Sequence, residues 1–243
     1  MTSPASDLPP LSGRSFAVLR ELMVERQIAA RGVHDPRVLA AMRKVPREAF
    51  LPEPMRDLAY EDAPVPIAAE QTMSQPYIVA LMVEALLLQG GDNVLEIGAG
   101  SGYAAAVLAE IAGHVTTVER IAALADAAAT RLAALGYGDV DVHRGDGTRG
   151  WPAAAPYDAI VVAAGGPQVP ESLKAQLKIG GRLVMPVGAD QHAQQLVRLT
   201  RLGEADFKRE HLGDVRFVPL LGAEGWQQPE PAGRTARDRD DPR

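Results

Sequence analysis

The segment that most constrains the fold is residues 94–102, Val-Leu-Glu-Ile-Gly-Ala-Gly-Ser-Gly, after which a helical pattern restarts at Tyr103. Its first half is rich in branched apolar residues, which suit a strand in the interior of a sheet. Its three glycines allow backbone conformations closed to other residues and let a ligand approach the main chain. A strand, a glycine turn and a helix in this order predict a nucleotide-type binding site.

The spacing of the glycines narrows the type of ligand. The dinucleotide fingerprint is G-x-G-x-x-G, whereas here the third glycine, Gly102, comes one residue early and Tyr103 takes its position. A glutamate, Glu96, also lies inside the strand. This pattern favours S-adenosylmethionine over a nicotinamide dinucleotide.

From residue 92 onward, segments typical of strands and helices alternate. The predicted helices are 102–112, 121–135 and 170–178, the last opened by Pro170 and closed by Gly180-Gly181. The predicted strands are 93–97, 115–119, 140–143, 157–163, 181–186, 195–200 and about 214–218. We therefore expect an α/β fold, a doubly wound and mostly parallel sheet of the Rossmann-like S-adenosylmethionine-dependent methyltransferase type.

Residues 14–89 predict a mainly helical N-terminal extension. Asp35 is a good N-cap before Pro36, Val45-Pro46 ends that helix, and a helical pattern returns over 77–88. We expect one domain over 14–226, with the helical part over 14–89 and the sheet core over 90–226. The proline-rich residues 1–13 are expected to be flexible, and residues 227–243, which lack large apolar side chains, to be a disordered tail.

Composition excludes several function classes. The 243 residues carry a net charge of −6 without a long basic run, so no nucleic-acid partner is expected. The absence of cysteine excludes disulfides, thiolate metal sites and a cysteine nucleophile, and the five scattered histidines show no metal-ligand spacing. Met1–Pro10 lacks the features of a signal peptide, and no apolar stretch is long enough to span a membrane. We expect a cytoplasmic protein.

Two acids follow the glycine turn at positions where a nucleoside would need them. Glu119 ends the second predicted strand, 21 positions after Gly98, the usual interval for a carboxylate that accepts hydrogen bonds from ribose hydroxyls. The alternative interpretation of Glu119 is a surface ion pair with Arg120 or Arg131. Asp146, between Gly145 and Gly147, can accept from an adenine amino group, or form an ordinary turn.

Residues 71–77, Gln-Thr-Met-Ser-Gln-Pro-Tyr, admit two interpretations. Because Ser74 precedes Pro76 and an apolar helix, the residues alone favour a helix cap. Trp151 is equally open, since its ring either lies against a cofactor or covers the core.

Several segments together resemble the protein-L-isoaspartate O-methyltransferase family, whose members methylate isoaspartyl residues in damaged proteins. The resemblance runs from about Met23 to Leu221, and its most specific parts are Thr72-Met-Ser-Gln-Pro76 and Val215-Arg-Phe-Val-Pro219. The other matching segments are Val45–Phe50, Val94–Tyr103, Val118–Ile121, Gly145–Gly147, Gly150-Trp151 and Tyr157–Val162.

The resemblance implies a role for each matching residue. Ser74 falls on the catalytic position, with Thr72, Gln75, Val218 and Pro219 beside it in contact with the substrate. The residues it implies as contacts of S-adenosylmethionine are Thr72, Glu96, Gly98, Ala99, Gly100, Ser101, Gly102, Glu119, Arg120, Asp146 and Gly147. The implied partners are isoaspartyl-containing proteins and peptides. We expect the protein to be a monomer that binds no metal and no membrane.

One departure from the family concerns substrate preference. Relatives usually carry glycines just before the Gln-Thr motif, whereas this chain has Ala68, Ala69 and Glu70. A first alternative is therefore a related methyltransferase that acts on aspartate of a dedicated peptide, to drive succinimide formation. Two further alternatives are an NAD-linked dehydrogenase and a binding module that kept the fold without activity.

The expected reaction requires the protein mainly to align the substrate carboxylate with the methyl donor. An isoaspartyl carboxylate is ionised at neutral pH, since free carboxyl groups titrate near 3.5, so in-line methyl transfer needs no general base. Ser74 is expected to donate a hydrogen bond to one carboxylate oxygen rather than to act as a nucleophile. The substrate is expected to lie extended along Val215–Leu220, whose alternation suits a strand edge.

Overall fold

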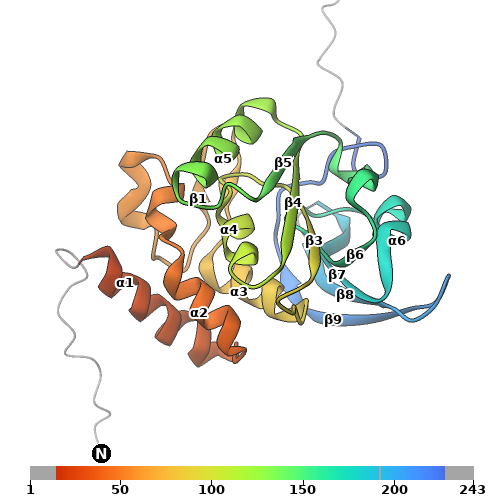
Figure 1. Ribbon diagram of the computed structural model, residues 1–243, viewed down its shortest axis with the longest axis horizontal. Helices are drawn as coiled ribbons and strands as arrows, with labels where there is room; N and C mark the ends of the chain where they lie inside the picture. Colours follow the sequence, from red (N-terminus) through yellow and green to blue (C-terminus); the bar gives the residue numbers. More distant parts are fainter. Residues whose placement is uncertain (1–14, 192, 228–243) are drawn as a thin grey trace, which may run out of the picture.

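A computed structural model describes residues 15–191 and 193–227 of the chain (Figure 1). The predicted flexible segment 1–13 and, apart from Gln227, the predicted tail lie outside the described residues. The predicted domain boundaries at 14 and 226 remain predictions. In the described part of the chain, no helix has both the length and the apolarity needed to cross a bilayer.

The centre of the molecule is a seven-stranded sheet in the order β5-β4-β3-β6-β7-β8-β9. The five strands β3 to β7 pair in parallel, and β8 and β9 pair antiparallel at one side of the sheet. The predicted mostly parallel sheet is therefore confirmed. The bounds are β3 Asn93–Ile97, β4 His114–Glu119, β5 Asp141–Arg144, β6 Tyr157–Val162, β7 Leu177–Asp190, β8 Ala193–Arg201 and β9 Phe207–Val215. Because β4 and β6 flank β3, the carboxyl ends of these three strands bound the switch point where such sheets bind ligands.

Helices cover both faces of the sheet (Figure 1). One apolar cluster joins α3 (Pro76–Ala85), α4 (Tyr103–Ala109) and Leu132 of α5 (Ala122–Ala134) to Val94 and Val161 of the sheet. A second cluster packs α6 (Glu171–Gln176) on the opposite face, against Leu95, Ile97 and Ile160. The alternation along β3 thus places Leu95 and Ile97 on the α6 face and Glu96 on the α3 and α4 face.

The N-terminal extension is helical, as predicted, with one small hairpin. It comprises α1 (Phe16–Leu22), a π-helical stretch (Met23–Ile28), 3-10 turns (Ala29–Arg31, Arg47–Phe50, Glu53–Leu58), α2 (Pro36–Lys44), β1 (Val65–Pro66) and β2 (Thr72–Met73). Asp35 caps α2 by accepting from the Arg37 amide, and the helix gives way to an extended Val45, both as predicted. The apolar residues of the extension, such as Met23, Met42 and Phe50, belong to the same cluster as α3 and α4.

Two predicted elements are wrong in their bounds. The helix predicted over 170–178 ends at Gln176, and Gly180-Gly181 lie inside β7, because Leu177 already pairs with Tyr157 of β6. The strand predicted near 214–218 is β9, which begins at Phe207 and ends at Val215. Residues 216–218 leave the sheet and cross toward the loop after β6, where Pro219 bridges Gly165.

Candidate active site

A cavity lies beyond the carboxyl ends of β3, β4 and β6, where the topology predicts a ligand. Its walls come from the glycine turn, from the end of β4 and from segments before α3 and after β9. Its lining includes most of the predicted cofactor contacts, namely Thr72, Glu96, Gly98, Ala99, Gly100, Ser101, Glu119, Arg120 and Gly147.

The glycine turn keeps the cavity open by its backbone shape. Gly102 has a φ of 89° at the start of α4, a conformation that L side chains rarely adopt, and a Cβ there would lie 3.3 Å from Leu132 Cγ. A Cβ on Gly147 would collide with Ile97 Cγ2. These two positions therefore require glycine, one for conformation and one for space. Gly102 itself does not line the cavity, and it affects the site only through the backbone conformation of the turn.

Glu119 is buried inside the turn rather than exposed on the surface. Its side chain accepts from the Gly100 amide through Oε2 at 3.0 Å and from the Ile121 amide through Oε1 at 2.9 Å. Arg131, named above as an alternative partner, donates instead to the Ser101 carbonyl at 2.7 Å. The carboxylate thus fixes the turn and faces the cavity with its remaining acceptor capacity.

Glu96 is the second acid of the cavity and is almost fully buried. Its Oε2 accepts from Thr117 Oγ1 on the neighbouring strand at 2.6 Å. Burial and, to a smaller extent, the charge of Glu119 raise the pKa of Glu96, the Thr117 hydrogen bond opposes the rise, and the net pKa is about 8. The cavity therefore places an acid with a raised pKa beside Glu119.

Asp146 lies apart from these two acids. Its carboxylate accepts from the Thr148 amide at 3.0 Å, from Thr148 Oγ1 at 2.7 Å and from the Ala223 amide at 2.8 Å. Burial opposes ionisation, but these hydrogen bonds and Arg149 lower the pKa of Asp146. Its side chain lines an adjacent cavity, which shares Arg120 and Leu221 with the main one, and it holds the C-terminal segment by accepting from the Ala223 amide.

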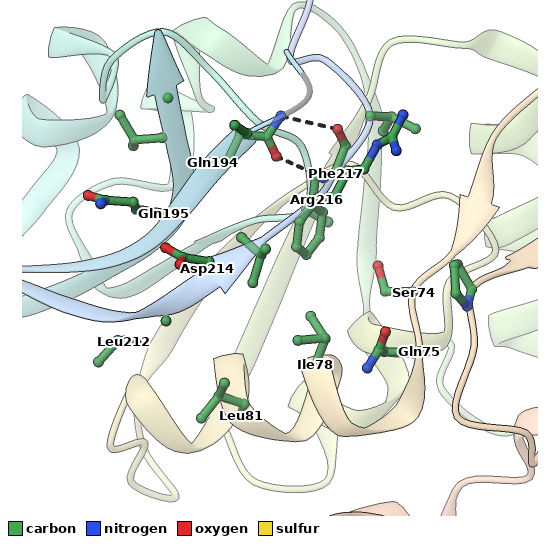
Figure 2. Close-up of a pocket in the computed structure, with 18 of the residues that line it drawn as sticks. Ser74, Gln75, Ile78, Leu81, Gln194, Gln195, Leu212, Asp214, Arg216 and Phe217 are labelled. Atoms are coloured by element: carbon green, nitrogen blue, oxygen red, sulfur yellow. Dashed lines mark hydrogen bonds between the residues drawn. The ribbon is translucent and has the colours of Figure 1, made fainter. Parts of the chain in front are cut away.

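A second, open cavity of about 1520 Å³ runs beside the first, between α3 and the end of the β8–β9 pair (Figure 2). Ile78 and Leu81 of α3 form one wall, and Gln195, Leu212 and Asp214 form the other. We call this cavity the groove. Its size and its mixed apolar and polar walls suit an extended polypeptide.

The two cavities share a wall at one place, which we call the junction. Six residues line both cavities, namely Thr72, Ser74, Ala163, Phe217, Val218 and Pro219. Sequence reasoning singled out four of the six and missed Ala163 and Phe217, whose apolar side chains carry no chemical signal. Gln75 lines the groove alone.

Ser74 is not the cap of α3. The helix begins at Pro76, its N-cap is Gln75, and no side chain caps it, so the helix-cap interpretation is wrong. The Ser74 carbonyl instead accepts from Arg47 Nη2 at 2.7 Å. The Ser74 side chain is therefore left to the junction, on the same side of the groove as Gln75 and facing the segment of Arg216 and Phe217 (Figure 2).

The side chain of Gln194 holds the segment after β9 through two hydrogen bonds to the main chain of Phe217 (Figure 2). Gln194 Oε1 accepts from the Phe217 amide at 2.8 Å, and its Nε2 donates to the Phe217 carbonyl at 3.2 Å. Gly165 donates to the Val218 carbonyl and accepts from the Leu220 amide, each at 2.8 Å. Much of the main chain predicted to meet the substrate over 215–220 is therefore already hydrogen-bonded within the protein.

The described residues around the cavities include no cluster of possible metal ligands. Within residues 15–191 and 193–227, no three histidine or acidic side chains gather as metal ligands. None of the described histidines lines either cavity. Trp151 lies away from both, stacked on His143 with ring centroids 3.9 Å apart and packed against the α6 face. Of the two interpretations of Trp151, the structure supports the one in which its ring covers the core.

Comparison with known proteins places the chain among isoaspartate methyltransferases. A family model described as protein-L-isoaspartate(D-aspartate) O-methyltransferase matches residues 19–225. A protein-L-isoaspartate O-methyltransferase of Rhodopseudomonas palustris (strain ATCC BAA-98 / CGA009) is 95% identical over 217 residues, which cover 89% of this chain and 100% of that protein. Protein-L-isoaspartate O-methyltransferase 1 of R. palustris (strain HaA2) is 69% identical over 239 residues, 98% of each chain.

Solved structures agree with the fold. A protein-L-isoaspartate O-methyltransferase structure is 32% identical, with a TM-score of 0.76, and the match covers 85% of this chain and 67% of that one. A Plasmodium falciparum structure, described as a complex with S-adenosyl-L-homocysteine, has a TM-score of 0.70 at 23% identity, covers 83% and 98% of the two chains, and supports the fold alone.

Proposed function

The chain belongs to the protein-L-isoaspartate(D-aspartate) O-methyltransferase family, and from this premise we propose how its residues carry the reaction. It is an S-adenosylmethionine-dependent enzyme that methylates the free carboxylate of isoaspartyl residues in damaged proteins, which starts repair through a succinimide. The relatives favour this substrate over the aspartyl alternative, and the family excludes the dehydrogenase and the inactive module.

The residues of the first cavity fit the cofactor. S-adenosylmethionine, when bound, supplies a methyl group activated by the positive charge on sulfur. The main-chain cradle at Gly98–Ser101 gives a close approach to the backbone, and Glu119 is placed to accept from ribose hydroxyls. Glu96 adds a second acid beside a ligand that carries two cationic centres. Asp146 stays a proposed contact of the adenine amino group, because two protein donors reach its Oδ1 and only one reaches its Oδ2, which leaves Oδ2 able to accept once more.

The groove holds the substrate polypeptide in this proposal. The isoaspartyl carboxylate enters at the junction, where Thr72 and Ser74 are the polar side chains and Phe217, Val218 and Pro219 exclude water. Exclusion of water strengthens each remaining polar contact. The observation that carries the proposal is that Ser74 lies in the wall shared by the two cavities, so that one side chain reaches both reactants.

The protein contributes alignment rather than proton transfer. The carboxylate is already ionised, and no described histidine lines the junction to act as a base. Ser74 Oγ would donate to one carboxylate oxygen and leave the other oxygen free toward the first cavity, where the bound cofactor would supply the methyl group. Orientation of this kind supplies on the order of 7–11 kcal/mol of the barrier reduction.

A methyl-transfer assay on matched peptides tests the proposed substrate. Two peptides of one sequence, one with an isoaspartyl and one with a normal aspartyl linkage, are incubated with radiolabelled S-adenosylmethionine. We expect base-labile methyl ester on the isoaspartyl peptide only. Methylation of the aspartyl peptide alone would instead support a dedicated aspartyl substrate. That the enzyme is a cytoplasmic monomer without affinity for nucleic acid stays a prediction.

A further inference from the structure

Arg47 is a buried cation that the proposed chemistry does not use. Its side chain is fully buried in the turn Arg47–Phe50, and it lines neither cavity. Nε donates to the Ala59 carbonyl and Nη2 to the Ser74 carbonyl, each at 2.7 Å. The guanidinium carbon lies 4.8 Å from the centroid of the Tyr103 ring.

This arrangement costs stability. Within the described residues, no carboxylate lies within ion-pair distance of Arg47, and its Nη1 has no hydrogen-bond partner. Burial lowers the pKa of Arg47, because the charged form loses hydration, although Tyr103 opposes the shift. Removing a charged group from water is unfavourable, and a buried donor without a partner adds to that cost. An apolar side chain of similar volume would avoid both costs, so packing alone does not explain an arginine here.

The contact with Ser74 offers an explanation. The Ser74 carbonyl precedes the N-cap of α3, so no amide of that helix hydrogen-bonds to it. Arg47 is the donor that fixes the peptide plane between Ser74 and Gln75. Strand β2 holds the chain just before Ser74, so a fixed plane just after it restricts ψ of Ser74 and with it the directions open to the Ser74 Cα–Cβ bond. Tyr103, on the other side of the guanidinium, is the first residue of α4 after the glycine turn.

We propose that Arg47 is a positioning residue for methyl transfer, which holds the Ser74 hydroxyl at the junction by hydrogen-bonding the Ser74 carbonyl. This inference rests on the proposed function, because it needs Ser74 to act on the substrate. Arg47 touches neither reactant and acts only through Ser74. Its removal should therefore affect turnover more than cofactor binding.

A double-mutant cycle tests this coupling. Arg47→Lys keeps the charge and Arg47→Met removes it, and each is made with Ser74 present and with Ser74→Ala. Folded sites are counted by calorimetric titration with S-adenosylhomocysteine, and kcat is expressed per folded site. We expect a dissociation constant within about threefold of wild type and a kcat about tenfold lower with Ser74 present. In the Ser74→Ala background the same change should lower kcat less than about twofold, because coupled residues are not additive.

A matched control separates positioning from stability. Arg20 is a largely buried arginine of the same extension, but it bonds Tyr60 and Glu48 and does not touch Ser74. We expect Arg20→Lys to lower Tm without changing kcat per folded site. Equal losses of kcat in both Ser74 backgrounds, or an unchanged kcat in the Arg47 variants, would overturn the proposal. A wild-type enzyme that fails to methylate the isoaspartyl peptide would refute the proposed function instead.

Discussion

Single side chains divide the site into a cofactor half and a substrate half. Glu96 and Glu119 are the acids of the first half, and Ser74 is the hydroxyl at its border with the groove. Both glutamates are held by protein hydrogen bonds before any ligand arrives, Glu119 by two main-chain amides and Glu96 by Thr117. The cofactor half is therefore preorganised, and the substrate half depends on how well Ser74 is held.

Ser74→Ala should separate turnover from cofactor binding. The hydroxyl is proposed to align the carboxylate, while the cofactor is held mainly by the glycine turn and Glu119. We expect kcat to fall at least about tenfold, which is about 1.4 kcal/mol of barrier, with S-adenosylhomocysteine affinity within about twofold. Ser15→Ala, which removes a hydroxyl at the start of α1, is the control and should retain full kcat. A parallel loss of affinity and kcat in Ser74→Ala would contradict the assigned role.

Glu96 should make the stability of the ligand-free protein depend on pH. Its pKa of about 8 in the folded state lies above the value of about 4.3 in an unfolded chain, so the folded state binds the proton more tightly. Its contribution to the free energy of unfolding is complete below the unfolded pKa and is lost as pH rises through about 8. Relative to wild type, Glu96→Gln should therefore gain Tm between pH 5 and about pH 8 and level off above that. A difference in Tm that stays constant over this range would refute the shift.

At the scale of elements, strands with buried side chains such as β3 could be predicted from the sequence, whereas the exposed edge strand β9 was misplaced. The pattern of Val94, Leu95 and Ile97 gave β3 with its observed bounds, because these side chains are buried. Strand β9 was misplaced because Lys208, Arg209 and His211 are exposed, and main-chain pairing to β8 holds the strand in place. Backbone pairing without burial leaves no hydrophobic period to detect.

The hairpin between β1 and β2 carries backbone strain, which the sequence analysis did not predict. Ala69 and Glu70 have φ values of 57° and 58°, in the left-handed region that favours glycine. The Gln-Thr motif follows them, and Gln71 lines the cofactor cavity. This chain therefore places two non-glycine residues where relatives with glycine would be relaxed.

Ala69→Gly should relieve part of this strain. An alanine in the left-handed region is strained by about 1–2 kcal/mol, which glycine removes. Glycine also raises the conformational entropy of the unfolded chain, which offsets about 0.4–1 kcal/mol of that gain in stability. We expect a net gain of about 0.5–1 kcal/mol in the free energy of unfolding, measured by urea denaturation. Ala205→Gly, at an exposed alanine in a bend outside the left-handed region, is the control and should not stabilise. A destabilised Ala69→Gly variant would show that the turn is not strained.

At the scale of the whole molecule, the site exists because distant segments meet. Thr72 and Ser74 come from the N-terminal extension, Glu96 and Glu119 from the sheet, and Val218 from the segment after β9. The sequence predicted Glu119 from its spacing to the glycine turn, and the other four only through the resemblance to a family. It could not predict Arg47, because one arginine in a turn carries no signal that its partners will be the carbonyls of Ala59 and Ser74. Such contacts depend on how the extension packs onto α3 and α4.

The arrangement of the two cavities leads to one geometric claim, that cofactor and substrate meet at Ser74. A crystal structure of the enzyme with S-adenosylhomocysteine and an isoaspartyl peptide tests it most directly. We predict the cofactor sulfur in the cavity bounded by the glycine turn and Glu119, and the peptide extended in the groove. One isoaspartyl carboxylate oxygen should lie within about 3 Å of Ser74 Oγ and the other should face sulfur. A peptide bound outside the groove, or a carboxylate that points away from Ser74, would contradict the account.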